Sequence, residues 1–161
     1  MSEQAVKQYL TFGLDGEVFA LDIVKVREVL ELTDVSKLPL TPDHMKGVIN
    51  IRGHAIPVVD MRSKLGMDKA GRTVDTCIII LDVLFESGVL TVGIVVDSVR
   101  EVIDLSEEAI EPPPHLGSSV DASYMAGLGY QGDQFIILLD ADSIFADEEV
   151  PLKQAPETKA A

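Results

Sequence analysis

The three histidines are the side chains best suited to metal binding or acid–base catalysis, and they are widely separated. His44, His54 and His115 each lack a cysteine or second histidine at the short spacing that zinc sites use. His44 and His115 lie beside prolines or in expected loops, where a solvated surface position is the simpler interpretation. We therefore expect no metal ligands among them.

A glycine motif, Gly127-Leu-Gly129-Tyr-Gln-Gly132, matches the G-x-G-x-x-G spacing of dinucleotide-binding loops. Such a loop must follow a strand and open a helix, because the pyrophosphate binds at the helix N-terminus. Here DASYMA precedes the motif and DQFIILLD, a strand pattern, follows it. The glycines are better interpreted as relief of backbone strain in tight turns. We expect no cofactor.

Other groups that could support catalysis are also poorly placed. Glu107 and Glu108 are adjacent, so on a helix they diverge, and they suit its first turn. Cys77 lies in the apolar run TCIIIL and resembles a small buried hydrophobic residue. No G-x-S-x-G or G-x-x-x-x-G-K motif is present. The sequence predicts a protein that is not an enzyme.

The stretch GVINIRGHAIPVVDMR, residues 47–62, places one arginine between two apolar runs. We interpret it as two strands joined at Arg52-Gly53, where Gly53 permits a positive φ angle. Pro57 cannot donate to a ladder, so its strand lies at an edge or beside a bulge. The guanidinium of Arg52 offers five donors to a carboxylate. That carboxylate could belong to this chain, which has 27 acidic residues, or to a partner.

Short strands dominate the elements that must position these residues. Runs rich in valine, isoleucine and leucine, bounded by glycine, aspartate or serine, predict strands at Tyr9–Asp15, Glu17–Ile23, 47–52, His54–Asp60, 76–83, 89–96 and 134–140. Short helices are expected near 60–66, after Ser106 and from Asp142. Many short strands with close turns favour small barrels or a sandwich.

An internal repeat indicates two half-domains of similar design. Val26-Arg-Glu-Val29 recurs as Val99-Arg-Glu-Val102, and Gly47…Asp60 has a counterpart in Gly127…Asp140. Both of the longer stretches run glycine, turn, apolar strand, aspartate and short helix. We expect the two copies to pack side by side and leave a groove between them.

Composition narrows the class of protein and the partners. The 161 residues suit one domain, and the net charge of −14 makes nucleic acid a poor partner. The N-terminus lacks a signal-peptide pattern and the apolar runs are too short to span a bilayer, so we expect a cytoplasmic protein without direct membrane contact. The polar ends, residues 1–6 and 148–161, are expected to be flexible around a single domain at 7–147.

Several motifs in the same order resemble the CheW family, the adaptors of bacterial chemotaxis arrays. They are FALDIVKVREVLE, LPLTPDHMKGVINIRGHAIPVVDMRSKLG, VGIVVDSVREVIDL and YMAGLGYQGDQFIILLD, and the similarity runs from Gln8 to Asp147. The resemblance implies a mainly β fold of two small five-stranded, SH3-like β-barrels packed side by side with short helices. It also implies a non-catalytic adaptor that couples chemoreceptors to the histidine kinase CheA in receptor arrays at the membrane.

The resemblance also implies which residues contact which partner. The receptor's helical-hairpin tip would dock between the barrels, and Val26, Glu28, Gly47 and Arg52 map to the receptor-facing surface. For Val26 and Val48, core packing is an equally good interpretation. The kinase's regulatory domain would meet the second barrel end-on, but no short motif assigns its contact residues.

Three alternatives remain open on the sequence alone. The same scaffold could serve another receptor–kinase pathway, such as surface motility or gene regulation. A small β-barrel enzyme or ligand-binding protein is a different class. An adaptor fused to a receiver domain is a third, but the chain after Asp147 is short against the roughly 120 residues that such a domain needs.

Overall fold

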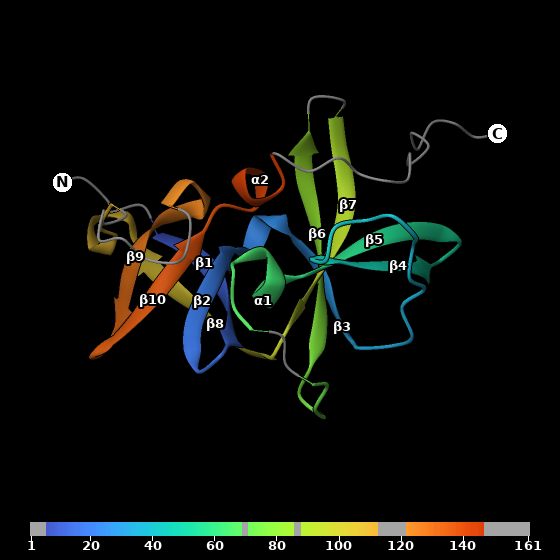
Figure 1. Ribbon diagram of the computed structural model, residues 1–161. Coiled ribbons are helices and arrows are strands. Elements are labelled where there is room, and N and C mark those ends of the chain that lie inside the picture. The colour runs from blue at the N-terminus through green and yellow to red at the C-terminus, as the bar shows by residue number, and fades with distance from the viewer. Residues whose placement is uncertain (1–5, 69–70, 86–87, 113–121, 147–161) are drawn as a thin grey trace.

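The computed structural model describes residues 6–68, 71–85, 88–112 and 122–146, which form two β-sheets side by side (Figure 1). The strands of this part of the chain are β1 (Val6–Leu14), β2 (Glu17–Asp22), β3 (Val26–Glu31), β4 (Met45–Ile51), β5 (His54–Asp60), β6 (Cys77–Phe85), β7 (Gly88–Val96), β8 (Ser98–Ser106), β9 (Met125–Gln131) and β10 (Gln134–Leu139). The helices are η1 (Ile23–Lys25), α1 (Met61–Lys64), η2 (Glu107–Ala109), η3 (Ala122–Tyr124) and α2 (Ala141–Ile144). The mainly β class predicted from the sequence is confirmed.

Each sheet has five strands, and the chain crosses between the sheets twice. The first sheet has the order β8-β1-β2-β10-β9, and the second has the order β3-β6-β7-β5-β4. The first sheet therefore combines both ends of the described chain, while the second is built from its middle. In each sheet one central pair is parallel, β2 with β10 and β5 with β7, and the other pairs are antiparallel.

The internal repeat predicted from the sequence corresponds to this matched topology. The two VREV segments lie in β3 and β8, which occupy the same position in their sheets. The hairpins β4–β5 and β9–β10 also correspond, with counterparts eighty positions apart along the chain. Each is followed by a four-residue helix whose N-cap is an aspartate, Asp60 or Asp140. The two sheets are thus two copies of one design.

The expected β-barrels are open sheets, because no described ladder joins β3 to β4 or β8 to β9. Side chains join the edge strands instead. In the second sheet Arg52 Nη2 donates to Glu28 Oε2, and in the first sheet Gln131 Nε2 donates to Glu101 Oε2 over 3.5 Å. Gly129 also lies against β8, since a Cβ there would come within 2.9 Å of a methyl group of Leu105. Each sheet therefore wraps around its own interior without closing its ladder.

Three apolar cores follow from this arrangement. The first sheet encloses Tyr9, Val18, Ala20, Ile103, Leu105, Ile136 and Leu138. The second encloses Leu32, Ile49, Ile56, Val58, Ile78, Ile80 and Val95. The largest core lies between the sheets, is called the inter-sheet core below, and includes Phe12, Phe19, Leu81, Ile94, Leu139 and Phe145. Because successive strand residues face opposite sides, each central strand contributes to two cores.

Two ion pairs fasten the crossings to the short helices. Arg62 on α1 donates to both carboxylate oxygens of Asp97, at 2.8 and 2.6 Å, just before β8. Lys25 on η1 donates to Asp142 on α2 at 2.8 Å. We call these two ion pairs the Arg62–Asp97 clasp and the Lys25–Asp142 clasp. Arg62 and Asp142 are counterparts in the repeat, so the helix residue is basic in one clasp and acidic in the other.

The structure corrects some boundaries expected from the sequence. Strands β3, β8 and β9 were not predicted from the sequence. Charged residues interrupt the apolar pattern of β3 and β8, and glycines interrupt the apolar pattern of β9. Val6 begins β1 although a flexible end was expected there, while residues 1–5 and 147–161 lie outside the described part. The helices α1 and α2 have four residues each, and no described helix could span a bilayer.

Candidate functional site

The Arg52-Gly53 turn presents the arginine of the opening motif at the end of the β4–β5 hairpin. Arg52 has φ +50° and Gly53 φ +87°, so both central residues are left-handed, as in the type I′ turns that join twisted strands. The Gly53 amide donates to Asn50 Oδ1 at 3.0 Å. A residue other than glycine is uncommon at a positive φ angle such as that of Arg52, and backbone strain of this kind is often found at functional positions. The turn places Arg52 at the end of the hairpin, where its side chain is 69% exposed and reaches Glu28 on β3.

Glu28 is the carboxylate that pairs with Arg52 in this chain. It lies on β3, where a register shift against β6 between Val26 and Glu28 marks a bulge. The side chain of Glu28 is 27% exposed, whereas that of Arg52 is 69% exposed. The internal ion pair considered from the sequence is therefore formed, yet most of the arginine side chain remains accessible. The pair fixes the direction of the guanidinium without burying it.

Val26 lies at the start of β3, two residues before Glu28. It is half-buried and packs against the inter-sheet core, so core packing accounts for part of its side chain. Val48 is half-buried as well, on β4. The structure thus places Val26, Glu28 and Arg52 in one region, with Val26 nearest to the junction of the two sheets.

Gly47 has a structural requirement of its own. Its φ is +146°, and a Cβ there would lie 2.1 Å from the backbone oxygen of Ser36. Ser36 and Val48 exchange backbone hydrogen bonds of 2.8 and 2.9 Å beside this glycine. Its counterpart Gly127 faces the carbonyl of Glu111 in the same way. Gly47 is buried, so a receptor contact through it stays a prediction that the structure does not test.

The other residues considered for chemistry are scattered. His44 lies just before β4, His54 begins β5, and His115 lies outside the described residues. The described residues contain no group of three or more histidine, cysteine, aspartate or glutamate side chains arranged to hold a metal. Glu107 and Glu108 form the first turn of η2 after the N-cap Ser106, as the sequence predicted. Burial is the main cause of the raised pKa of the Cys77 thiol, which disfavours a reactive thiolate.

The glycine motif Gly127–Gly132 occupies β9 and the turn that follows it. Strand β10 comes next, where a dinucleotide site needs the N-terminus of a helix. Gly127 has φ +158° and Gly132 φ +64°. The arrangement therefore agrees with the interpretation that these glycines relieve backbone strain, and they also allow neighbouring segments to approach closely.

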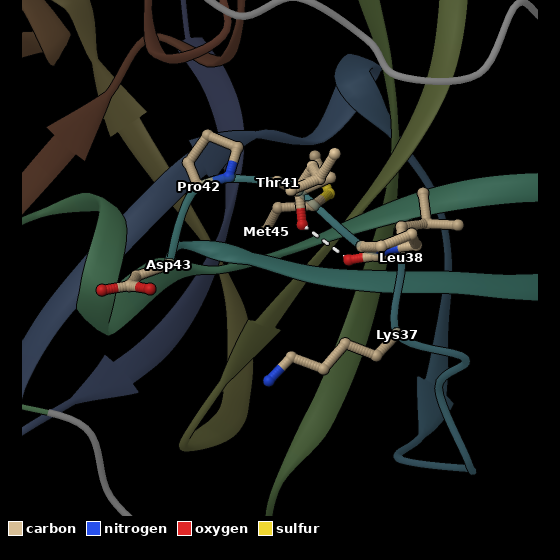
Figure 2. A pocket seen from close by; sticks show the side chains of 8 residues that line it. Lys37, Leu38, Thr41, Pro42, Asp43 and Met45 are labelled. Atoms are coloured by element: carbon tan, nitrogen blue, oxygen red, sulfur yellow. Dashed lines mark hydrogen bonds between the residues drawn. The ribbon is translucent and has the colours of Figure 1, made fainter.

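A hollow of 410 Å³ is formed by the loop that leads into β4 (Figure 2). It is lined by consecutive residues, 37–43, together with Met45. Thr41 Oγ1 donates to the carbonyl of Leu38 at 3.0 Å, which folds the loop back on itself. None of the four predicted receptor-facing residues contributes to its lining. The hollow is therefore not part of the Arg52 site.

Comparison with known proteins identifies the family of this chain. A family model described as CheW-like domain matches residues 8–149. The chain belongs to the CheW-like family. Chemotaxis protein CheW of Klebsiella aerogenes is 35% identical over 150 residues, covering 93% of this chain and 88% of that protein. Chemotaxis protein CheW of Rhizobium meliloti is 34% identical over 143 residues, covering 89% and 90%.

A solved structure supports the same membership. The crystal structure of the scaffolding protein TtCheW from Thermoanaerobacter tengcongensis matches with a TM-score of 0.82 and 34% identity, covering 94% of this chain and all of that one. Membership of this chemotaxis scaffold family confirms the prediction of a non-catalytic protein.

Proposed function

We propose that this CheW-like chain is an adaptor that couples the cytoplasmic tip of methyl-accepting chemoreceptors to the regulatory domain of a CheA-type histidine kinase. It would act in the cytoplasm, in receptor arrays at the membrane, without touching the lipid. The observation that carries the proposal is the Arg52 side chain, held outward by a left-handed turn and aligned by Glu28 in a chain of this family.

Val26, Glu28 and Arg52 would form the receptor-facing surface, and Gly47 would support it by admitting the Ser36 segment beside β4. Val26 offers apolar area near the junction of the sheets, which suits the apolar face of a helical hairpin. Arg52 would give register and specificity through acceptors on the receptor, since exposed charges contribute more to these than to affinity. Small contacts suffice in an array, because many copies act together.

The test is Arg52→Glu, with binding to a purified receptor-tip fragment measured by calorimetry and folding measured by circular dichroism. We expect affinity for the tip to fall about tenfold or more, because the variant places like charges at Glu28 and presents an acid to the receptor. The fold should persist, because an exposed ion pair contributes about 1 kcal/mol or less to stability.

Arg27→Glu is the matched control. Like Arg52, Arg27 is an exposed arginine; it lies on β3, and its guanidinium is directed toward Asp82 on β6 at 3.4 Å and Thr91 on β7 rather than toward Glu28. It should bind the tip like the wild type. If both variants bind alike, or if Arg52→Glu unfolds, Arg52 serves only the internal bridge and the receptor assignment is wrong.

A further inference from the structure

The Lys25–Asp142 clasp holds the chain at the point where it enters the proposed receptor-facing surface. Lys25 is the last residue of η1, and Val26 and Glu28 of that surface follow it at the start of β3. The Lys25 ammonium donates to both carboxylate oxygens of Asp142, over 3.0 and 2.8 Å. The two side chains are only about a third exposed, 31% and 34%, so water screens the pair in part. A residue of α2 is thus tied to the residue directly before the proposed surface.

Packing alone anchors η1 only lightly. None of its residues is buried: Ile23 is half-buried against the inter-sheet core, and Val24 is 77% exposed. The ladder that follows is irregular, because the register of β3 against β6 shifts between Val26 and Glu28. A segment with few buried side chains beside a bulge has low local stability and more than one accessible backbone arrangement. A side-chain tie at this point therefore decides which arrangement prevails.

Asp142 is itself firmly placed, as an anchor must be. Its helix α2 is seated by the buried side chains of Ala141 and Ile144, and the amide of Leu84 on β6 donates to its carboxylate at 2.8 Å. Burial works to raise the pKa of the Asp142 carboxyl, but the hydrogen bonds from the Leu84 amide and from Lys25 outweigh it and the pKa is lowered. The carboxylate is therefore ionised at neutral pH and available to Lys25.

The repeat supplies a matched clasp in the other half of the molecule. Arg62 on α1 holds Asp97, two residues before the VREV segment of β8, just as Asp142 on α2 holds Lys25 before that of β3. In both cases the helix after one sheet's hairpin ties down the entry into an edge strand of the other sheet. Only the Lys25–Asp142 clasp adjoins the proposed receptor-facing surface. The two clasps should therefore affect stability alike and receptor binding differently.

We propose that Asp142 and Lys25 are positioning residues for receptor binding, an inference that rests on the proposed adaptor function. Asp142 fixes Lys25, which holds the first residues of β3 in place. Glu28 on that strand then directs the guanidinium of Arg52. Neither member of the clasp touches the receptor. When the clasp is broken, the binding groups remain but occupy the productive arrangement for a smaller fraction of the time, which lowers the apparent affinity by that fraction.

Asp142→Asn is the test variant, because the amide keeps an acceptor for the Leu84 amide and removes the charge that holds Lys25. Binding of the full-length chain to a purified receptor-tip fragment is measured by calorimetry, and the melting temperature by circular dichroism. We expect affinity for the fragment to fall about three- to tenfold. Lys25→Met should give a similar loss, whereas Lys25→Arg, which can still pair with Asp142, should bind within about twofold of the wild type.

Asp97→Asn is the matched control, since it removes the carboxylate charge from the equivalent clasp of the other half. It should lower the melting temperature about as much as Asp142→Asn does, yet leave affinity for the receptor tip within about twofold of the wild type. A role in stability alone predicts that the two variants bind equally. Equal losses of affinity in Asp97→Asn and Asp142→Asn would thus overturn the inference.

Other outcomes also decide the matter. Unchanged affinity in Asp142→Asn rejects the positioning role. So does a loss confined to the Lys25 variants, Lys25→Arg included, which would mean that the ammonium contacts the receptor directly. If Asp142→Asn and Lys25→Met both fail to fold, the clasp serves stability alone. A wild-type chain that does not bind the receptor-tip fragment contradicts the proposed function itself, a result distinct from the failure of this inference.

Discussion

Single residues with left-handed backbone determine how the proposed binding surface is displayed. In the Arg52-Gly53 turn the strain of the arginine is compensated by a glycine next to it and by the hydrogen bond to Asn50. The turn is therefore specified by local chemistry, and the position of the guanidinium follows from it. Glu28, from a strand at the far edge of the same sheet, then limits its rotation.

Gly53→Val tests the turn directly. A Cβ at Gly53 would have open space around it, so any cost comes from φ +87°, which a β-branched residue strongly disfavours. We expect a loss of about 2 kcal/mol of unfolding free energy and a fall of about 4–8 °C in melting temperature, measured by calorimetry. Gly71→Val is the control, since Gly71 has equally open space without a left-handed φ. Equal melting temperatures for the two variants would contradict the strain argument.

At the scale of elements, the two ion-pair clasps connect the short helices to the crossings between sheets. The Arg62–Asp97 clasp also reaches the β1–β2 turn, because the amide of Asp15 donates to Asp97 at 2.8 Å and Arg62 lies 3.8 Å from the Asp15 carboxylate. The Lys25–Asp142 clasp reaches β6, because the amide of Leu84 donates to Asp142. Each clasp therefore joins both sheets to one helix.

The Arg62–Asp97 clasp predicts a defined pH dependence. The hydrogen bonds from Arg62 lower the pKa of the Asp97 carboxyl, and burial opposes that shift only in part. A carboxyl with a lowered folded-state pKa stabilises the fold above its unfolded pKa of about 3.9. That stabilisation is lost as the pH falls through the lower folded-state value. We expect Asp97→Asn to cost about 1–2 kcal/mol at pH 7, after allowance for solvent screening, and progressively less below pH 4.

Denaturant unfolding of wild type and variant from pH 7 to pH 3 measures this difference. Asp104→Asn is the control, because Asp104 is exposed and accepts a single hydrogen bond from Gln8 at 3.3 Å. Its stability should follow that of the wild type at every pH. A difference between Asp97→Asn and wild type that stays constant down to pH 3 would show that the carboxylate charge is not what stabilises the clasp.

At the scale of the whole molecule, the duplication was the feature most accessible from the sequence. The VREV repeat and the paired glycine-to-aspartate stretches predicted two similar halves and their aspartate-started helices, since both signals are local. The partner of Arg52 could not be predicted among 27 acids, because Glu28 approaches it only through the wrapping of the second sheet. The contact between Tyr130 and Phe135, opposite residues of the β9–β10 hairpin, was not predicted, although aligning the two hairpins at a spacing of eighty residues shows that Asn50 and Ala55 stand at the corresponding positions.

The chain crossings and the inter-sheet core make the two sheets one cooperative unit. The first sheet needs strands from both ends of the described chain, so its pairing must close a loop over the whole segment that forms the second sheet. Leu81 of β6 and Phe19 of β2 are both fully buried members of the inter-sheet core. A defect in that core should therefore weaken both sheets together rather than the one that carries it.

Leu81→Ala, followed by native-state amide hydrogen exchange, tests this cooperativity. The substitution should cost about 2–5 kcal/mol, as large-to-small changes in buried cores do. We expect equal losses of protection at Ile94 in the second sheet and Ile137 in the first, because their amides exchange through the same global unfolding. Val102→Ala, at a half-exposed position of β8, should leave both amides protected. Loss of protection at Ile94 alone would mean that the sheets open independently, and the inter-sheet core would then be a contact between two units rather than the centre of one.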